Sequence, residues 1–338
     1  MSWKRLTILA LSVTMLAALA AAGAAWQAWE RLNAPGLVEE PGTTIEIPSG
    51  ASFRQVVSLL ERHSAFDDEF ALRVYARFTG ADGRVRAGEY ALEPEMTVLD
   101  ALDRFTRGEV IQHRITLVEG LTFQQIRQVI AAHPVLEQTL TDLSDEQVMA
   151  ELGAPERHPE GWFYPSTYTF PRGTSDRDLL SRAMGRMEQR LEQEWANRAD
   201  NLPLSDPYEA LILASIIERE TGRDDERAKV AGVFTRRLEK GMRLQTDPTV
   251  IYGMGDAYDG RIRTADLRRD TPYNTYTRHG LTPTPIAMPG TASIRAAVNP
   301  ADHDYLYFVS RGDGSHQFSR TLAEHNRAVR RYILGEEE

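Results

Sequence analysis

Apolar positions are dense between residues 211 and 217, where the sequence reads LILASII. A stretch that is apolar on nearly every face is typical of a helix buried inside a domain. Ser205 or Asp206 can cap the first amides of this helix, and Pro207 suits its first position. Gly222 is expected to end the helix in a left-handed conformation.

This predicted helix carries an ionisable residue, Glu218, near its end. At helical spacing Glu218 shares a face with Ser215 and Thr221, whereas Glu220 is rotated by about 200° and is expected to face solvent. Burial against apolar groups disfavours the charged form of a carboxyl, so Glu218 is suited to donating a proton near neutral pH. An ion pair with a nearby arginine would instead make Glu218 structural, and the helix alone leaves both roles open.

A second apolar run lies at the N-terminus. Lys4 and Arg5 precede twenty uncharged residues, 6–25, and Trp26 and Trp29 follow them. Twenty helical residues extend about 30 Å, the thickness of the hydrocarbon core of a bilayer. The basic flank is expected to stay in the cytoplasm, with the tryptophans at the opposite interface. A cleaved signal peptide is the alternative, although its apolar region is usually only about 7 to 15 residues long.

The sequence therefore predicts an uncleaved, single-pass membrane anchor over residues 1–30, followed by a short linker over residues 31–43. No second run of this kind follows in the sequence. We therefore expect the anchor in a bacterial inner membrane, with its N-terminus in the cytoplasm and the rest of the chain in the periplasm.

Residues 45–63 and 115–133 follow the same pattern, with five identities over nineteen aligned positions. Each predicts a strand, a glycine turn, a capped helix start and an amphipathic helix. The caps pair a hydroxyl residue with a glutamine three positions later: Ser52 with Gln55, and Thr122 with Gln125. A repeated binding module and chance convergence on a common local motif both explain the pattern.

The stretch between these copies predicts another strand and then a helix that begins after Thr97 and ends at Gly108. Near the end of the chain, residues 305–310 read as a strand and residues 321–333 as a last helix. Strands and helices do not alternate regularly along the chain. The predicted fold class is therefore α+β rather than an ordered βαβ series.

Composition narrows the classes of function. The chain has 338 residues, enough for about two domains, and a formal net charge of −10. The negative charge and the lack of a basic stripe argue against a nucleic-acid partner. The absence of cysteine excludes disulfides, thiol nucleophiles and cysteine metal sites. No metal-binding or cofactor-binding motif is present, so we expect no metal and no cofactor.

Several long motifs resemble one family in their order along the chain. They are EGWFYPSTYTF from 160, LILASIIERET from 211, GMRLQTDPTVIYGMG from 241, YNTYTRHGLTPTPIAMPG from 273 and YLYFVSRGDGSHQFSRTLAEHN from 305. Together with the anchor, these motifs resemble the YceG-like family of endolytic murein transglycosylases. The earlier AGEYAL stretch resembles the LysM-like part of that family. The resemblance implies a LysM-like subdomain over 44–112 and a catalytic domain over 113–335.

The resemblance also implies a reaction. Glu218 matches the catalytic glutamate of the family, which protonates the glycosidic oxygen between MurNAc and GlcNAc and then, as a carboxylate, removes a proton from the MurNAc 6-hydroxyl. The product carries a 1,6-anhydro end and no water is consumed. The implied partners are peptidoglycan glycan strands, the inner membrane and, as candidates, the peptidoglycan synthases that make nascent strands.

Other residues of these motifs are candidates for binding substrate. Gln245 to Asp247 precede a proline in a predicted extended loop, and tyrosines suit sugar faces. Each also has a structural explanation, as a turn cap or as part of the core. The candidates are Glu160, Ser215, Gln245, Thr246, Asp247, Tyr273, Asn274, Tyr276, His316 and Asn326.

Two other functions stay open from the sequence. A muramidase would use Glu218 with a second carboxylate, Glu160 or Asp247, and a water molecule. A membrane-tethered scaffold would bind glycan without cleaving it, and its Glu218 would be structural.

Overall fold

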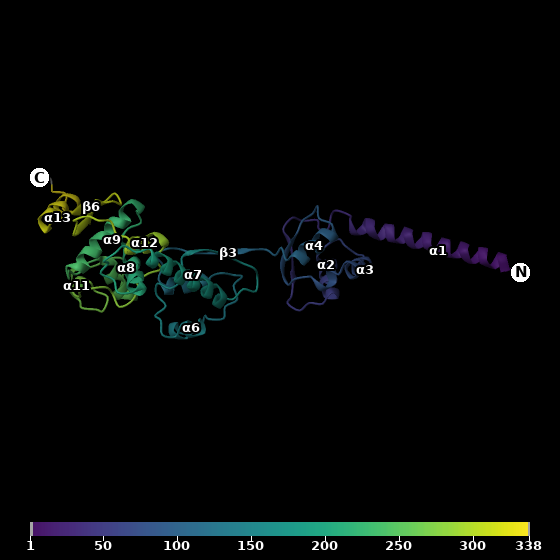
Figure 1. Cartoon of the computed structure of the whole chain (residues 1–338), viewed down its shortest axis with the longest axis horizontal. Coiled ribbons are helices and arrows are strands. Elements are labelled where there is room, and N and C mark those ends of the chain that lie inside the picture. The colour runs from purple at the N-terminus through teal and green to yellow at the C-terminus, as the bar shows by residue number, and fades with distance from the viewer. Residues whose placement is uncertain (1–2, 337–338) are drawn as a thin grey trace. The chain divides into compact units, whose positions relative to one another are not determined.

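The computed structural model describes residues 3–336, which form two compact units (Figure 1). The first unit comprises the chain up to His113 together with Thr169–Gly173. The second comprises Arg114–Tyr168 and the chain from Thr174 onward. Helices and short strands occur in both, so the predicted α+β class is confirmed.

The N-terminal helix α1 spans Trp3–Leu32. Within it, Thr7–Leu32 contains an 18-residue stretch with a mean hydropathy of 2.1 and is long and apolar enough to cross a membrane. By length and composition α1 is therefore compatible with a single-pass anchor. Residues 1–2 of the predicted anchor lie outside the described part of the chain.

The first unit is built from two strands and the helices packed on them. Its elements after α1 are β1 (Thr43–Ile47), α2 (Phe53–His63), α3 (Glu69–Thr79), η1 (Ala81–Gly83), β2 (Gly88–Leu92) and α4 (Val98–Arg107). β1 pairs with β2 in antiparallel register, from Thr43 opposite Leu92 to Ile47 opposite Gly88. Leu60, Leu72 and Phe105 are fully buried between these elements.

Local sequence signals set the helix ends in this unit. Ser52 and Thr97 both form capping boxes, in which the hydroxyl accepts the amide of the third helical residue and that residue's side chain accepts the cap amide. Gly108 closes α4 in the left-handed conformation that glycine adopts without strain. The predicted caps and the predicted end of the helix at Gly108 are therefore confirmed.

The second unit is mainly helical. The elements that lie wholly within it are α5 (Phe123–Ala131), α6 (Asp145–Glu151), α7 (Asp176–Ala196), α8 (Pro207–Glu220), α9 (Asp224–Glu239), α10 (Asp247–Met254), η2 (Gly255–Ala257), α11 (Thr264–Arg268), α12 (Thr291–Val298), β5 (Tyr307–Ser310), β6 (His316–Ser319), α13 (Leu322–Val329) and the π-helical turn η3 (Arg330–Leu334). Strands β3 (His113–Leu117) and β4 (Ser166–Phe170) also have most of their residues in this unit, while His113, Thr169 and Phe170 belong to the first. β3 pairs with β4, and β5 pairs antiparallel with β6. Thr122 forms the predicted capping box at the start of α5.

Helix α8 lies at the centre of this unit, in contact with α7, α9, α10 and α12 (Figure 1). Every residue from Leu211 to Ile217 is buried, as the apolar pattern predicts. Asp206 caps the helix and Pro207 occupies its first turn. The expected left-handed stop at Gly222 is wrong, because α8 ends at Glu220 and the next residue, Thr221, is already extended.

A buried carboxylate connects the start of α7 to the segment before α6. The side chain of Asp176 is 2% exposed and accepts the backbone N–H groups of Thr139 and Leu140, both at 2.9 Å. It also accepts the amide of Arg177 at 2.8 Å. Asp176 therefore accepts hydrogen bonds from backbone amides in a segment that has no regular secondary structure to satisfy them.

Replacing Asp176 with alanine should destabilise the second unit, because it leaves these amides without an acceptor. We expect a loss of about 2 to 3 kcal/mol, seen as a drop of several degrees in the thermal transition of that unit. The control is Asp178→Ala, which removes an exposed carboxylate of the same turn and should cost less than about 1 kcal/mol. Equal transitions for the two variants would contradict a special role for Asp176.

Candidate functional site

The end of α8 presents two carboxyl groups to different surroundings. Glu218 lies among buried groups, and its side chain is 7% exposed. Its Oε2 accepts the backbone N–H of Gly290 at 2.9 Å. Its Oε1 lies 3.9 Å from Nη2 of Arg227, which is also 7% exposed. Glu218 is therefore held between one backbone donor and one buried cation.

Arg227 comes from the first turns of α9. One of its amino groups pairs with the exposed Asp224. Its Nε is buried and has no hydrogen-bond partner among the described residues. A buried, unpaired N–H is costly, and a functional role is one explanation for such a group.

A second carboxylate, Glu119, lies beside Glu218. Glu119 follows strand β3 and is exposed. Its carboxylate rests against the Cα of Gly290, so closely that a Cβ atom at Gly290 would overlap it. The carboxyl of Glu119 is partly buried by its neighbours, and this raises its pKa. The charge of the neighbouring Glu218 raises this pKa further, whereas the charge of Arg227 lowers it.

Main-chain pairing brings these groups together from distant parts of the sequence. The N–H of Gly120 donates to the carbonyl of Met288 at 2.9 Å, and the N–H of Met288 donates to the carbonyl of Leu121 at 2.8 Å. Gly120 has a φ of +79°, which glycine adopts at low cost in the turn after β3. The turn after β3 and the loop before α12 are thereby fixed against each other beside Glu218.

Ser215, a predicted substrate-binding residue, supports the same loop from inside the core. Its hydroxyl is fully buried, donates to the carbonyl of Ile212 at 2.7 Å and accepts the N–H of Ile286 at 2.9 Å. In this structure Ser215 therefore connects α8 to the loop that carries Gly290.

Glu220 lies in a different environment from the one its helical position suggests. Its Oε2 accepts a short hydrogen bond from the hydroxyl of Thr246, and burial raises the pKa of Glu220 above its ordinary value. The charges of His316 and Arg237 lower this pKa in part. The expectation that Glu220 faces solvent is wrong, because residues from later in the chain cover that side of α8.

Several predicted site residues gather around Glu220 rather than Glu218. The hydroxyl of Tyr276 donates to Oδ1 of Asp247 at 2.6 Å, and the N–H of Thr246 donates to the hydroxyl of Thr275 at 3.1 Å. These contacts hold the start of α10 against the 275–276 segment.

The backbone before α10 differs in detail from the predicted extended loop. Thr246 is extended and is the N-cap position, but Asp247 is already the first helical residue. Gln245 is exposed and has a φ of +48°. A left-handed conformation at a residue other than glycine costs about 1 kcal/mol or more, and such strain clusters at functional sites.

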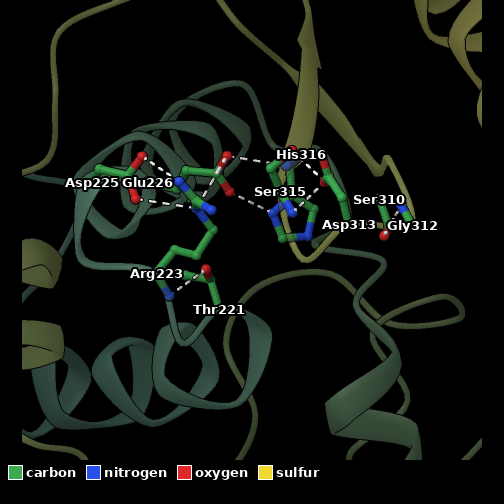
Figure 2. A network of polar contacts seen from close by, with 9 residues as sticks. All are labelled: Thr221, Arg223, Asp225, Glu226, Ser310, Gly312, Asp313, Ser315 and His316. Carbon is green, nitrogen blue, oxygen red and sulfur yellow. Dashed lines mark hydrogen bonds and ion pairs between the residues drawn. The ribbon is translucent and has the colours of Figure 1, made fainter.

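His316 approaches Glu220 from the β5–β6 hairpin. Its Nδ1 lies 2.8 Å from Oε2 of Glu226, and its backbone N–H donates to Oε1 of the same carboxylate at 3.0 Å (Figure 2). Figure 2 also shows Arg223 paired with Asp225 beside this contact. Glu226 therefore fixes the position of His316 at the start of β6.

The other candidates are further from these two carboxyls or have structural contacts. Tyr273 shares a 2.9 Å hydrogen bond with Thr284 and packs edge-on against Tyr252. The side-chain amide of Asn274 is buried and donates to loop carbonyls between residues 266 and 269, which gives it a structural role in this structure. Asn326 is exposed on α13.

Glu160 lines a cavity with a volume of about 1100 Å³, to which Arg219, Pro248 and Tyr273 also contribute. Its side chain is 3% exposed and accepts the N–H of Phe123 at 3.0 Å and the hydroxyl of Tyr252 at 3.1 Å. Burial raises the pKa of Glu160 to about 8. This residue is thus a mostly protonated acid near neutral pH, bonded to the start of α5.

The arrangement can perform acid and base chemistry at Glu218, which has a donor, a cation and a second carboxyl around it. Sequence reasoning missed Glu119, Arg227 and Gly290. The VEGLTF stretch contains a signal for the first of them, since an acidic residue precedes a turn glycine directly after a strand. Arg227 has no such signal, because α9 contains several arginines.

Comparison with known proteins bears on this site. A model of the YceG-like family matches residues 45–331. The endolytic murein transglycosylase of Bacillus subtilis (strain 168) is 35% identical over 311 residues, covering 87% of this chain and 86% of the relative. The protein of the same name from Streptococcus pneumoniae serotype 2 (strain D39 / NCTC 7466) is 26% identical over 324 residues, covering 86% of this chain and 58% of that relative.

A solved structure is also similar. The crystal structure of a putative yceG-like protein from Listeria monocytogenes superposes with a TM-score of 0.54 at 30% sequence identity, covering 86% of this chain and 99% of that chain. The relatives confirm the predicted enzyme class, lytic transglycosylase. With a matching family model over most of its length and a relative of 35% identity, the chain belongs to the YceG-like family.

Proposed function

We propose that the chain is an endolytic peptidoglycan lytic transglycosylase that cleaves the bond between MurNAc and GlcNAc and leaves a 1,6-anhydro-MurNAc end. The observation that carries the proposal is the placement of Glu218. It lies in the last turn of a buried helix within the matched family region, between the N–H of Gly290 and the guanidinium of Arg227. The names of the relatives support the reaction.

In the first step protonated Glu218 acts as the general acid. Its proton goes to the glycosidic oxygen, and the bond between that oxygen and C1 of MurNAc breaks. GlcNAc leaves with the proton, and positive charge develops at C1 and the ring oxygen. Glu218 is then a carboxylate, which the Gly290 N–H and Arg227 are placed to stabilise.

In the second step the same residue acts as the base. The Glu218 carboxylate takes the proton of the MurNAc 6-hydroxyl while O6 bonds to C1. Glu218 is protonated again, the MurNAc residue contains a new ring between C1 and O6, and no water is consumed. One carboxyl is therefore sufficient for the turnover, in contrast to hydrolysis, which generally needs two.

The residues around Glu220 are proposed to bind the glycan beside the reacting bond. Gln245 and Asp247 are exposed, and Tyr276 is oriented by its hydrogen bond to Asp247. Exposed amide, carboxylate and aromatic groups suit the hydroxyls and faces of sugars. The strained backbone at Gln245 supports a functional use of this segment.

The muramidase alternative receives less support. Both oxygens of Glu160 are engaged in hydrogen bonds that hold the start of α5 and Tyr252. Asp247 lies with the Glu220 group, where Tyr276 donates to it. Neither residue is positioned by a contact with Glu218 or its partners Gly290 and Arg227.

The layout of the chain is part of the same proposal. Helix α1 would anchor the protein in the bacterial inner membrane with its N-terminus in the cytoplasm. Residues 44–112 would form the LysM-like subdomain, and residues 113–335 the catalytic domain in the periplasm. Anchoring would keep the site near nascent glycan strands and the synthases that make them.

The proposal predicts the products formed by the full-length protein in detergent micelles from purified peptidoglycan. Mass spectrometry should find soluble fragments with anhydro ends, one water lighter than reducing ends. Glu218→Gln should lower their rate of formation by at least about 100-fold, because the amide cannot donate or accept the proton. Glu192→Gln, an exposed change on α7, should leave the rate unchanged.

Two outcomes would contradict the proposal. Fragments with reducing ends would make the protein a hydrolase. Glycan binding without fragments from either the wild type or the variants would favour the scaffold.

Glu160 gives a separate prediction about stability and pH. Its folded pKa of about 8 lies above the ordinary glutamate value of 4.5, so the acid form contributes stability in full below about pH 4.5. That contribution is lost as the pH rises toward 8. Glu160→Gln cannot ionise, so its melting temperature should fall several degrees less than that of the wild type between about pH 5 and about pH 8. Identical pH dependence in thermal scans would show that Glu160 does not titrate in this way.

A further inference from the structure

Two carboxyl groups meet at Gly290, although they lie 99 positions apart in sequence. Glu218 accepts the N–H of Gly290 at 2.9 Å. The carboxylate of Glu119 occupies the space where a side chain at Gly290 would begin. One glycine residue is therefore in contact with both acids, and its missing side chain is what lets the second acid approach.

The approach of Glu119 is fixed by backbone rather than by a flexible loop. The residue precedes Gly120, whose N–H donates to Met288, and Met288 donates in turn to Leu121. Nη1 of Arg219 donates to the carbonyl of Gly120 at 3.1 Å and so supports the same turn from α8. The pairing of the two acids is therefore part of the fold.

The charged groups that face Glu119 come from two helices. Glu218 and Arg219 come from α8, and Arg227 and Asp224 come from the start of α9. Arg227 lies 3.9 Å from Glu218 but is shared with Asp224. One buried cation therefore serves three carboxyl groups, which is too little positive charge for Glu119 and Glu218 both to be ionised at low cost.

We propose that Glu119 is a positioning residue of the Glu218 site, and that the two carboxyls act as one coupled pair that keeps a single proton near neutral pH. This inference rests on the proposed function of Glu218. Glu119 is exposed and Glu218 is buried, so the pair extends from the protein surface to the reacting acid.

The physical reason is the repulsion of like charges. A carboxyl next to a carboxylate loses its proton less readily, and two such groups titrate in two separate steps that belong to the pair. The raised pKa of Glu119, caused by burial and by Glu218, agrees with this geometry. Because the two groups are close, removing the last proton from the pair places two negative charges side by side, which is costly.

The proton balance of the reaction is unchanged. The pair starts with one proton, which is on Glu218 when the glycosidic oxygen accepts it. Both carboxyls are then ionised until Glu218 takes the proton of the 6-hydroxyl. The pair ends with one proton, as it began, and Glu119 does not need to touch the substrate.

The test is the pH profile of the full-length protein in detergent micelles, acting on soluble, uncross-linked glycan strands. The initial rate of anhydro-product formation is measured from about pH 5 to about pH 9. In Glu119→Gln the alkaline limb should move to lower pH by about one unit, while the rate on the acid side stays within about twofold of wild type. Glu192→Gln, which removes a negative charge elsewhere in the same unit, should leave the limb in place.

Gly290→Ala provides a second, independent variant. The backbone of Gly290, with φ −79° and ψ 170°, suits alanine, and the group in the way is the end of the Glu119 side chain. Alanine should therefore displace the Glu119 carboxylate and keep the N–H that Glu218 accepts. Its alkaline limb should move in the same direction as in Glu119→Gln.

The outcomes distinguish a failure of the coupling between Glu119 and Glu218 from a failure of the proposed role of Glu218. A wild-type profile in both variants overturns the coupling. An equal loss of rate at every pH in a folded Glu119→Gln variant also overturns it, since Glu119 would then act in another way. If Glu218→Gln stays active, the proposed role of Glu218 fails instead. Carboxyl ¹³C NMR titration of wild type and Gly290→Ala still tests the pair in that case, because it needs no activity.

Discussion

The burial of α8 is the constraint on which the rest of the second unit depends. Every residue from Leu211 to Ile217 is buried, so the helix cannot rotate or slide without exposing apolar surface on some side. The position of its last turn is therefore fixed. That turn carries Glu218 and Glu220 into two different polar environments, one on each side of the helix.

The groups around Glu218 differ in chemistry from the groups around Glu220. Around Glu218 there are a backbone donor, a buried arginine and a second acid, which are the groups that control where a proton resides. Around Glu220 there are hydroxyl, amide and aromatic groups on a strained and partly exposed segment. In the proposed reaction the first group would control the proton, and the second would hold the sugar chain beside it.

Local patterns in the sequence predicted much of the fold. The apolar run of α8, its cap at Asp206 and the capping boxes at Ser52 and Thr122 depend on residues within one or two turns, and all are confirmed. The expected stop at Gly222 was wrong locally, and the other error arose where distant segments meet. Helical geometry alone gave Glu220 a free face, but residues from 246 onward cover it.

The candidate site was only partly accessible to sequence reasoning for the same reason. Motifs drew attention to Gln245, Thr246, Asp247 and Tyr276, and the structure brings these residues together. The acid beside Glu218 could not be found in this way, since its position depends on hydrogen bonds between the 120–121 turn and Met288. Hydrogen bonds between such distant segments produce no periodic pattern in a single sequence.

The buried hydroxyl of Ser215 has a consequence for how the protein matures. It joins the middle of α8 to the N–H of Ile286, four residues before the glycine that contacts both acids. Closing the hydrophobic core and assembling the acid site are therefore one event. With Glu218 as the proposed acid, a chain whose core is still open would lack a competent site, and activity on the cell wall would appear only once folding is complete.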